Sequence, residues 1–152
     1  MVNFTLIYLS SINIKRKRGC MMKILLLSHG NFAKECYLTC QMIMGSIESV
    51  SYYTLSYGQD LELYQCQIEE QLASNDQTLI LCDLFGGSPF MIASKLLAKP
   101  DISERVELVT GLNMAMLLEV CSNLDENLAK LKEIAIKAGK NGIVDLKEKL
   151  NS

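Results

Sequence analysis

The sequence predicts an α/β fold, a doubly wound three-layer sandwich with helices on both faces of a mainly parallel sheet. Three observations support this prediction. Short apolar runs alternate with segments of helical periodicity along the chain. The apolar runs are nearly continuous, as in strands that are buried on both faces. Each run leads into a turn-forming segment and then a helical pattern, which is the order of βαβ units.

The first half of the chain supplies two of the expected strands. The apolar run 23–27 predicts a buried strand, and a helical pattern follows over 31–44 until Gly45 ends it. Residues 49–55 are rich in β-branched and aromatic side chains, which favours a second strand. Residues 60–73 place apolar side chains three or four positions apart, which predicts one buried face of a helix.

The second half supplies two more strands and three helices. The runs 78–82 and 105–110 predict the third and fourth strands, with a helix over 89–98 between them. A short helix is expected to begin near Asn113. A longer helix follows, because residues 124–138 carry an apolar stripe at helical spacing.

The end of the chain predicts a short C-terminal strand in addition to these four. Gly139 to Gly142 should end the long helix, and the next residues, 143–145, include two β-branched side chains. A strand this short needs a sheet edge to pair with. Glycines before it would allow pairing either with the chain's own sheet or with that of a second copy.

We expect one domain over residues 22–150 and an N-terminal extension over 1–21 that is not part of it. The apolar stretch 1–14 precedes the basic cluster 15–18, whereas a secretory signal carries its basic residues first. The stretch is also shorter than the roughly 20 apolar residues of a membrane span. A start codon placed too early is the preferred explanation, and a weak membrane-surface anchor is the alternative.

Charge and cysteine content exclude several classes of function. Outside the basic cluster the chain has 11 basic against 17 acidic residues, a net charge of −6, which argues against a nucleic-acid partner. The six cysteines form no CxxC pair and there is one histidine, which argues against a disulfide framework or a zinc site. Reduced, structural cysteines without a metal imply a cytoplasmic protein.

The single histidine, His29, is the first candidate for chemistry. It directly follows the first predicted strand, at the edge where parallel sheets place their ligands. It also precedes a helix start, whose N–H groups favour a phosphate. Asp83 holds the equivalent position after the third strand. It could accept a hydrogen bond from one imidazole N–H and leave the other nitrogen nucleophilic, although a loop or capping aspartate is the alternative.

The segment Gly-Gly-Ser-Pro at 86–89 is typical of a turn that leads into a helix. Glycine permits positive φ and close approach of another group, Ser88 suits the N-cap, and Pro89 suits the first helical position. A purely structural cap would look the same. This segment would nevertheless place a second helix start opposite His29. We therefore treat four residues as candidate phosphate-binding groups: Gly30, Gly86, Gly87 and Ser88.

Three segments carry a family resemblance. Residues 27–33 read LSHGNFA, residues 83–90 read DLFGGSPF, and residues 109–114 read VTGLNM. In this order and spacing they resemble the phosphohistidine segment, the DLxGGSP segment and the third loop of one family of IIA domains. It is the mannose/fructose/sorbose family of the bacterial phosphoenolpyruvate-dependent sugar phosphotransferase system. The resemblance covers about residues 22–150, with Ser28 standing where a glycine is often found.

This resemblance implies a mechanism and a set of partners. The carrier protein HPr would present a phosphohistidine, and His29 would attack the phosphorus through Nε2 while Asp83 holds Nδ1–H. Helix N-termini, the backbone of 86–88 and the Ser88 hydroxyl would stabilise the transition state. The phosphoryl group would pass to a IIB protein or domain and then to sugar entering through IIC and IID membrane components. The resemblance also implies a homodimer and no cofactor.

Three alternatives stay open at this stage. A phosphoryl-carrier subunit that feeds dihydroxyacetone kinase would share the fold and the histidine, although the DLFGGSP segment favours sugar transport. A flavodoxin-type binding module would need a Ser/Thr-rich phosphate loop after the first strand, and the loop at 28–31 is too short. A regulatory phosphoprotein would be modified on the same histidine and differ only in its partners.

Overall fold

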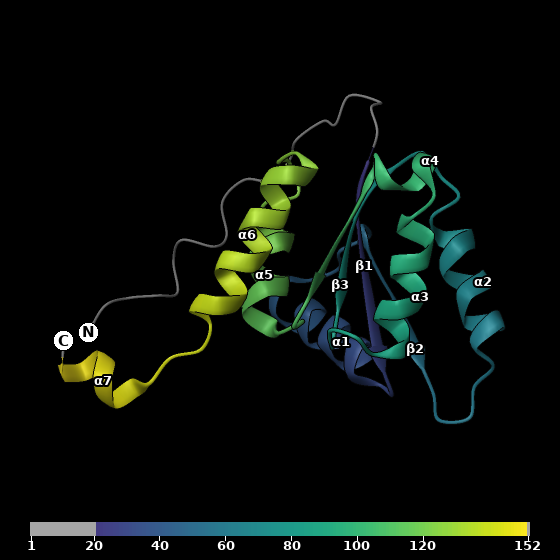
Figure 1. Cartoon of the computed structure of the whole chain (residues 1–152). Helices are drawn as coiled ribbons and strands as arrows, with labels where there is room; N and C mark the ends of the chain where they lie inside the picture. The colour runs from purple at the N-terminus through teal and green to yellow at the C-terminus, as the bar shows by residue number, and fades with distance from the viewer. Residues whose placement is uncertain (1–20, 152) are drawn as a thin grey trace.

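The computed structural model describes residues 21–151, and its centre is one parallel sheet of four strands (Figure 1). Spatially the strands run in the order β2-β1-β3-β4, and every neighbouring pair is parallel. Their bounds are β1 (Met22–His29), β2 (Val50–Leu55), β3 (Gln77–Cys82) and β4 (Val106–Thr110). The predicted α/β class and the four predicted strands are confirmed.

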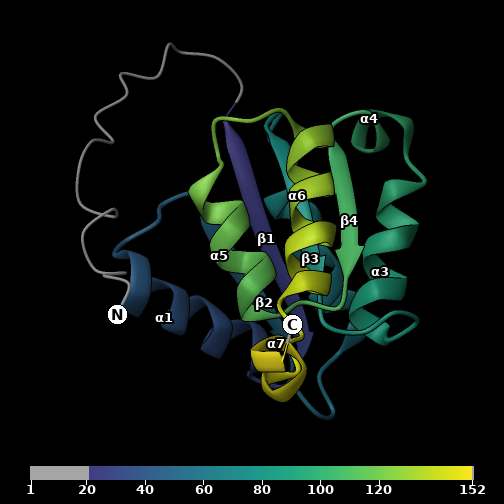
Figure 2. The same ribbon diagram turned by 90° about the vertical axis from the view of Figure 1, so that its left-hand side faces the viewer.

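Helices cover both faces of this sheet, so the three-layer prediction is also confirmed (Figures 1 and 2). One face carries α1 (Phe32–Met44), α5 (Met114–Ser122) and α6 (Leu128–Asn141). The other carries α2 (Leu61–Gln71), α3 (Ser88–Leu97) and the short α4 (Pro100–Ser103), which the sequence analysis did not predict. No helix within residues 21–151 combines the length and the hydropathy needed to cross a lipid bilayer.

The central position of β1 in the sheet explains why its sequence is a continuous apolar run. Ile24 and Leu26 face the core under α1, α5 and α6, whereas Leu25 and Leu27 face the core under α2 and α3. All four side chains are at most 1% exposed. Because successive strand residues point to opposite faces, a strand covered on both sides must be apolar at every position. Truncating any of these side chains to alanine should cost about 2–5 kcal/mol of stability.

The strand order creates a switch point between β1 and β3. After β1 the chain adds β2 on one side, and it then returns to add β3 on the other side of β1. At such a point the connecting helices leave toward opposite faces, which opens a crevice beyond the strands' carboxyl ends. Here β1 ends in His29 and β3 is followed by Asp83, whose N–H donates to the carbonyl of Leu27 (3.0 Å).

The end of the chain differs from the prediction. Residues 143–145 form no strand in this chain and lead instead into a short helix, α7 (Leu146–Asn151). The reason is local, since Asp145 caps that helix: its Oδ1 accepts from the N–H groups of Lys147 and Glu148 at 2.9 and 3.2 Å. Figure 1 shows α7 lying away from the sheet and its helices.

The prediction that Gly139 to Gly142 ends the long helix is confirmed, because α6 runs through Gly139, ends at Asn141 and has Gly142 as its C-cap. A Cβ at Gly139 would lie 2.7 Å from Cε of Met116, and one at Gly142 would lie 2.4 Å from Cβ of Ala115. These glycines therefore allow the end of α6 to pack closely on the start of α5. Residues 1–20 lie outside the described range. The prediction that residues 1–21 are not part of the domain therefore stays a prediction.

Candidate active site

His29 is the last residue of β1, and its imidazole lies at the carboxyl edge of the sheet. The side chain is 44% exposed, although the strand before it is buried. The chain turns immediately afterwards at Gly30, whose φ of +51° lies in the left-handed region. The N–H of Gly30 donates to the carbonyl of Leu55 on β2 (2.9 Å). The imidazole is thus held at the end of a buried, central strand of the sheet.

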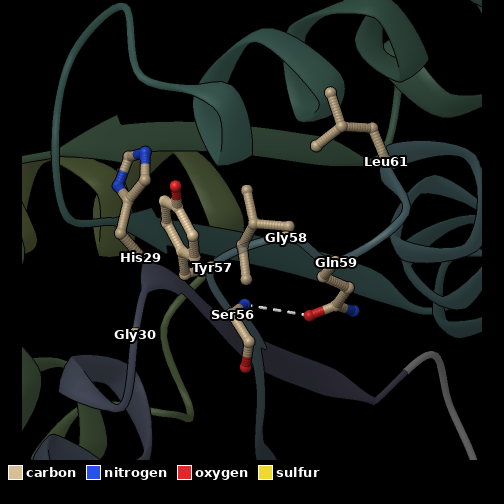
Figure 3. Close-up of a pocket in the computed structure, with 8 residues that line it drawn as sticks. His29, Gly30, Ser56, Tyr57, Gly58, Gln59 and Leu61 are labelled. Carbon is tan, nitrogen blue, oxygen red and sulfur yellow. Dashed lines mark hydrogen bonds between the residues drawn. The ribbon is translucent and has the colours of Figure 1, made fainter.

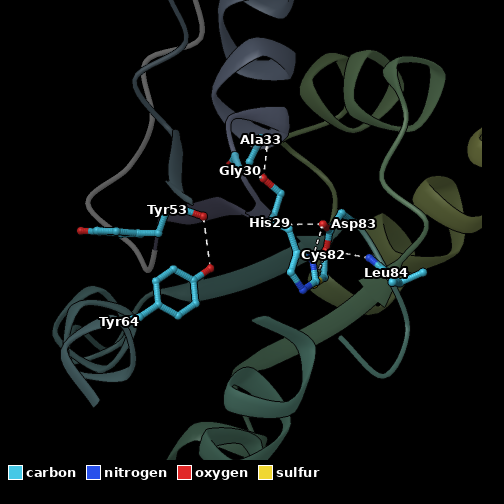
Figure 4. Close-up of polar contacts among 9 residues, drawn as sticks. His29, Gly30, Ala33, Tyr53, Tyr64, Cys82, Asp83 and Leu84 are labelled. Carbon is cyan, nitrogen blue, oxygen red and sulfur yellow. Dashed lines mark hydrogen bonds and ion pairs between the residues drawn. The ribbon is translucent and has the colours of Figure 1, made fainter. Parts of the chain in front are cut away.

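Asp83 is brought directly against this ring, as the sequence predicted (Figure 4). Oδ2 of Asp83 lies 2.8 Å from Nδ1 of His29 and also accepts from the backbone N–H of His29 at 2.8 Å. Oδ1 accepts from the backbone N–H of Leu84 at 2.7 Å and lies 3.5 Å from Sγ of Cys82. Both carboxylate oxygens are therefore fixed, and the carboxylate is only 14% exposed.

The protonation state of Asp83 follows from these contacts. Burial raises its pKa, but hydrogen bonds from the N–H groups of His29 and Leu84 outweigh burial and leave the pKa below its usual value. The neighbouring Cys82 thiol is buried, which raises its pKa to about 12, so it stays protonated and donates to Oδ1 of Asp83. Asp83 is consequently an anion at neutral pH.

An ionised carboxylate fixes the tautomer of the imidazole. Since a carboxylate only accepts hydrogen bonds, Nδ1 of His29 must carry the proton that Oδ2 of Asp83 receives. In the neutral ring the lone pair is then on Nε2. Within residues 21–151 no group makes a hydrogen bond to Nε2. The arrangement presents a nucleophilic nitrogen to solvent and places a negative charge where it would stabilise a positive ring.

The Gly-rich turn after β3 lies against the same ring. Gly86 has a φ of +78°, and Gly87 is the N-cap of α3, which begins at Ser88. Ser88 is therefore the first helical residue, and the expectation that it forms the N-cap is wrong. A Cβ at Gly87 would lie 2.4 Å from Cε1 of His29 and 3.1 Å from Nε2. The start of α3 thus borders the free edge of the imidazole.

Sequence reasoning missed the role of Ser28, which is completely buried beneath the site. Its Oγ accepts from the N–H of Ala33 at 2.7 Å and lies 3.3 Å from the carbonyl of Gly30 (Figure 4). Asn31 is the N-cap of α1 but makes no side-chain capping bond, so Ser28 satisfies a first-turn N–H instead. A serine in an otherwise apolar buried strand was the signal that could have revealed this.

A second missed feature is the turn after β2. Residues 56–59, together with Leu55 and Leu61, border an open pocket of about 500 Å³ into which His29 and Gly30 also face (Figure 3). Tyr57, at the tip of this turn, lines the pocket with the imidazole. The turn itself carries ordinary loop residues, so no sequence pattern predicted its position beside His29.

The third motif loop does not reach the imidazole by any hydrogen bond within residues 21–151. Instead, Asn113 caps α5 through Met116 N–H (3.0 Å) and donates to the carbonyl of Gly139 at the end of α6 (3.2 Å). Leu112 N–H donates to the carbonyl of Cys82 (3.0 Å), which ties this loop to the end of β3. In the described part of the chain, no three His, Cys, Asp or Glu side chains converge on a potential metal position.

Residues 23–136 match the family model described as PTS system fructose IIA component. The PTS system mannose-specific EIIAB component of Escherichia coli K12 is 32% identical over 127 residues, which cover 80% of this chain. The chain spans only 38% of that relative's length.

Two solved structures share the fold along nearly their whole length. Phosphotransferase system component EIIA from Streptococcus agalactiae superposes with a TM-score of 0.79 at 27% identity, covering 84% of this chain and 99% of that one. The PTS IIA protein associated with the fucose utilization operon of Streptococcus pneumoniae has a TM-score of 0.75 and 31% identity, covering 86% and 97%. This chain therefore belongs to the mannose/fructose/sorbose family of PTS EIIA components.

Proposed function

We propose that the chain is a cytoplasmic phosphohistidine carrier that accepts a phosphoryl group from phospho-HPr on His29 and passes it to a IIB component. The observation that carries the proposal is the His29–Asp83 pair. Its 2.8 Å contact orients an exposed imidazole, and the contacting atom is Nδ1, which leaves Nε2 free. The chain contains no other histidine that could take this role.

The transfer requires no net proton movement. The Nε2 lone pair of His29 attacks phosphorus in line, a new N–P bond forms, and the N–P bond to the donor's imidazole breaks. The donor nitrogen recovers its electron pair. While the His29 ring gains positive charge, Asp83 stabilises it through the Nδ1–H bond, and its low pKa keeps it ionised throughout. No cofactor enters these steps because the donor is already an activated phosphoramidate.

Backbone groups of the Gly-rich turn would hold the phosphoryl oxygens. The first N–H groups of any helix lack helical acceptors, and α3 begins beside the Nε2 edge of His29. Gly86 and Gly87 let this backbone approach the ring, and Ser88 adds a hydroxyl at the helix start. Gly30 supplies the tight turn that directly follows His29. We assign phosphate contacts to these four residues on this basis.

The accepting side is a IIB protein or domain, from which the phosphoryl group moves to sugar entering through IIC and IID membrane components. In this scheme the IIA unit never contacts the sugar, so its site has no sugar-specific feature to select. The E. coli relative is named an EIIAB component, and this chain aligns with 38% of it.

We further propose a homodimer in which the C-terminal segment 142–151 lies against a second copy. Ile143, Leu146 and Leu150 are 84%, 66% and 76% exposed, and no residue of α7 is buried. Residues 143–151 bury no side chain against the described part of the chain, so contact with a second copy would cover their apolar side chains. Pairing with a partner's sheet edge is the arrangement that would turn residues 143–145 into the predicted exchanged strand.

Phosphorylation of the purified full chain tests the carrier function. Incubation with phosphoenolpyruvate, enzyme I and HPr should add one acid-labile, base-stable phosphate per chain, and a IIB component should then remove it. His29→Ala should gain none. Normal labelling of that variant would disprove the proposal. Labelling of the wild type without transfer to any IIB would indicate instead a phosphoprotein with another partner.

A further inference from the structure

Cys82 is a buried thiol in direct contact with the carboxylate of Asp83. It is the last residue of β3, it is 0% exposed, and it belongs to the core cluster under α2 and α3. Its Sγ lies 3.5 Å from Oδ1 of Asp83 (Figure 4). A small apolar side chain would fill this place in the core equally well. Packing alone therefore does not explain a group that donates a hydrogen bond to the site.

The thiol completes a set of four donors around Asp83. Oδ2 accepts from the backbone N–H and from Nδ1–H of His29, each at 2.8 Å. Oδ1 accepts from the N–H of Leu84 at 2.7 Å and from the S–H of Cys82 at 3.5 Å. An ionised carboxylate offers about four lone-pair positions, so each position has a donor. Within residues 21–151, Cys82 and His29 are the only side chains that hydrogen bond to this carboxylate.

The surroundings of the sulfur direct its proton toward Oδ1. Burial raises the pKa of the Cys82 thiol to about 12, although the N–H groups of Leu84 and Asp83 lie against the sulfur and oppose this rise. The thiol therefore keeps its proton at neutral pH. Because these N–H groups approach the sulfur as an acceptor, its own S–H is left to donate to the carboxylate.

Tyr64 is the other ionisable group packed near this pair. Its ring is completely buried, and its hydroxyl donates to the carbonyl of Tyr53 on β2 (3.2 Å) instead of to Asp83. Burial, together with the neighbouring Cys82 and Asp83, raises the pKa of Tyr64 well above its usual range, so the phenol stays neutral. In the described part of the chain, the titratable groups that act on Asp83 are thus His29, the Cys82 thiol and this neutral phenol.

We propose that Cys82 is a positioning residue for phosphoryl transfer, whose S–H holds Oδ1 of Asp83 so that Oδ2 stays on Nδ1 of His29. This inference rests on the proposed function, since it assumes that His29 accepts a phosphoryl group. A thiol is a weak donor, so it restrains the carboxylate without withdrawing much of its charge. That charge is what stabilises the imidazole ring while it becomes positive.

Infrared spectroscopy tests the hydrogen bond itself. The S–H stretching band lies in a region that is free of other protein bands. Subtracting the spectrum of Cys82→Ser from that of the full wild-type chain isolates the band of this one thiol. Donation to a carboxylate lowers its frequency, so the same subtraction made in the Asp83→Ala background should place the band at higher frequency. An equal frequency with and without the carboxylate would disprove the hydrogen bond.

The kinetic test removes the donor and then restores one. Cys82→Ala should lower kcat for transfer from phospho-HPr by about two- to tenfold with little change in KM. It should also raise the pKa of Asp83, because the ionised carboxylate loses a donor. The carboxyl ¹³C titration of Asp83, identified by its absence in Asp83→Asn, measures that pKa. Cys82→Ser supplies a hydroxyl donor and should bring both kcat and the titration midpoint back toward wild type.

Cys40→Ala is the matched control. Cys40 is 1% exposed in the core on the opposite face of the sheet, where its sulfur lies 3.9 Å from Sγ of Cys121 and 3.9 Å from Sδ of Met44. Its truncation removes the same atoms from a buried position. The melting temperature should therefore fall in both alanine variants, whereas kcat and the Asp83 midpoint should stay at wild-type values in Cys40→Ala.

The outcomes separate this inference from the proposed function. A wild type that accepts nothing from phospho-HPr would disprove the function and, with it, this role of the thiol. A wild type that accepts normally, with kcat and the Asp83 midpoint unchanged in Cys82→Ala, would disprove only the positioning role. An equal loss of kcat in Cys40→Ala, or a Cys82→Ser variant no better than Cys82→Ala, would show that a loosened core slows transfer, which also contradicts the proposal.

Discussion

The backbone of Gly87 lies so close to the imidazole of His29 that a Cβ there would come within 2.4 Å of Cε1 and 3.1 Å of Nε2. Gly87 itself has a φ of −71° and a ψ of 165°, which any residue adopts. Its glycine identity is therefore explained by the approach of the ring and not by backbone strain. Gly86 is the reverse case, with a φ of +78° and open space where its Cβ would be.

This contrast predicts different effects for two neighbouring substitutions. Gly87→Ala should displace the imidazole from Asp83 and slow phosphoryl transfer by roughly 10- to 100-fold, while stability changes by less than about 1 kcal/mol. Gly86→Ala should cost about 1–3 kcal/mol of stability through backbone strain. Transfer rates and urea denaturation of both variants measure this. Equal stability losses, with normal transfer in Gly87→Ala, would contradict the steric explanation.

Asp83→Asn tests the carboxylate. The substitution keeps the shape but removes the charge that stabilises the developing imidazolium and fixes its tautomer. Losing a charged hydrogen bond of about 1.5–3 kcal/mol corresponds to a transfer rate that is lower by about one to two decades. Rapid-quench measurement of phosphate appearing on His29 provides the rate. A wild-type rate in this variant would rule out the proposed role.

The lowered pKa of Asp83 also predicts how stability depends on pH. Its folded pKa lies below that of an unfolded aspartate, about 3.9, so its stabilising contribution is fully present above that pH. The contribution is lost as the pH falls through the folded pKa. The difference in unfolding free energy between wild type and Asp83→Asn should accordingly shrink as the pH falls from about 5 toward 3. Denaturant titrations at these pH values provide the measurement, and a difference that grows in acid would contradict the assignment.

Ser28→Ala tests the support beneath the site. The variant leaves the buried N–H of Ala33 without its acceptor, which should cost about 1–3 kcal/mol of stability. It should also slow phosphoryl transfer, because the end of β1 that carries His29 loses its hydrogen bond to the first turn of α1. Ser94→Ala is the matched control, since the Ser94 hydroxyl donates to a carbonyl on the exposed surface of α3 (2.9 Å), and it should change stability by less than about 0.5 kcal/mol. Equal effects of the two variants would show that Ser28 has no special role.

The sequence was sufficient to predict the parallel sheet and the pairing of His29 with Asp83. Buried parallel strands show as continuous apolar runs, and parallel strands end at one edge, so His29 and Asp83 could be placed together without coordinates. The contact of Gly87 with the ring could not be predicted, because it depends on side-chain positions in three dimensions. Ile143 and Val144 favour the predicted strand, but in the single chain residues 143–145 form no strand and the cap at Asp145 starts a helix, so a strand exchanged with a second copy stays a prediction.

Removing residues 143–152 tests the proposed homodimer. The deletion leaves α6 complete, including the close contact of Gly142 with Ala115, so the monomer's fold should survive. If the segment lies against a second copy, its loss should convert dimer to monomer. Paired substitution of Ile143 and Val144 by Asp should act in the same direction, because it places charge on apolar surface that the partner would cover.

Light scattering at tens of micromolar provides the measurement, with Leu63→Asp as the control. Leu63 is 57% exposed on α2. This helix covers the face of the sheet opposite to α6, so the variant should stay dimeric. A full chain that is monomeric across ordinary salt concentrations would disprove the homodimer. A dimer that persists after the deletion would show instead that another surface holds the two copies together.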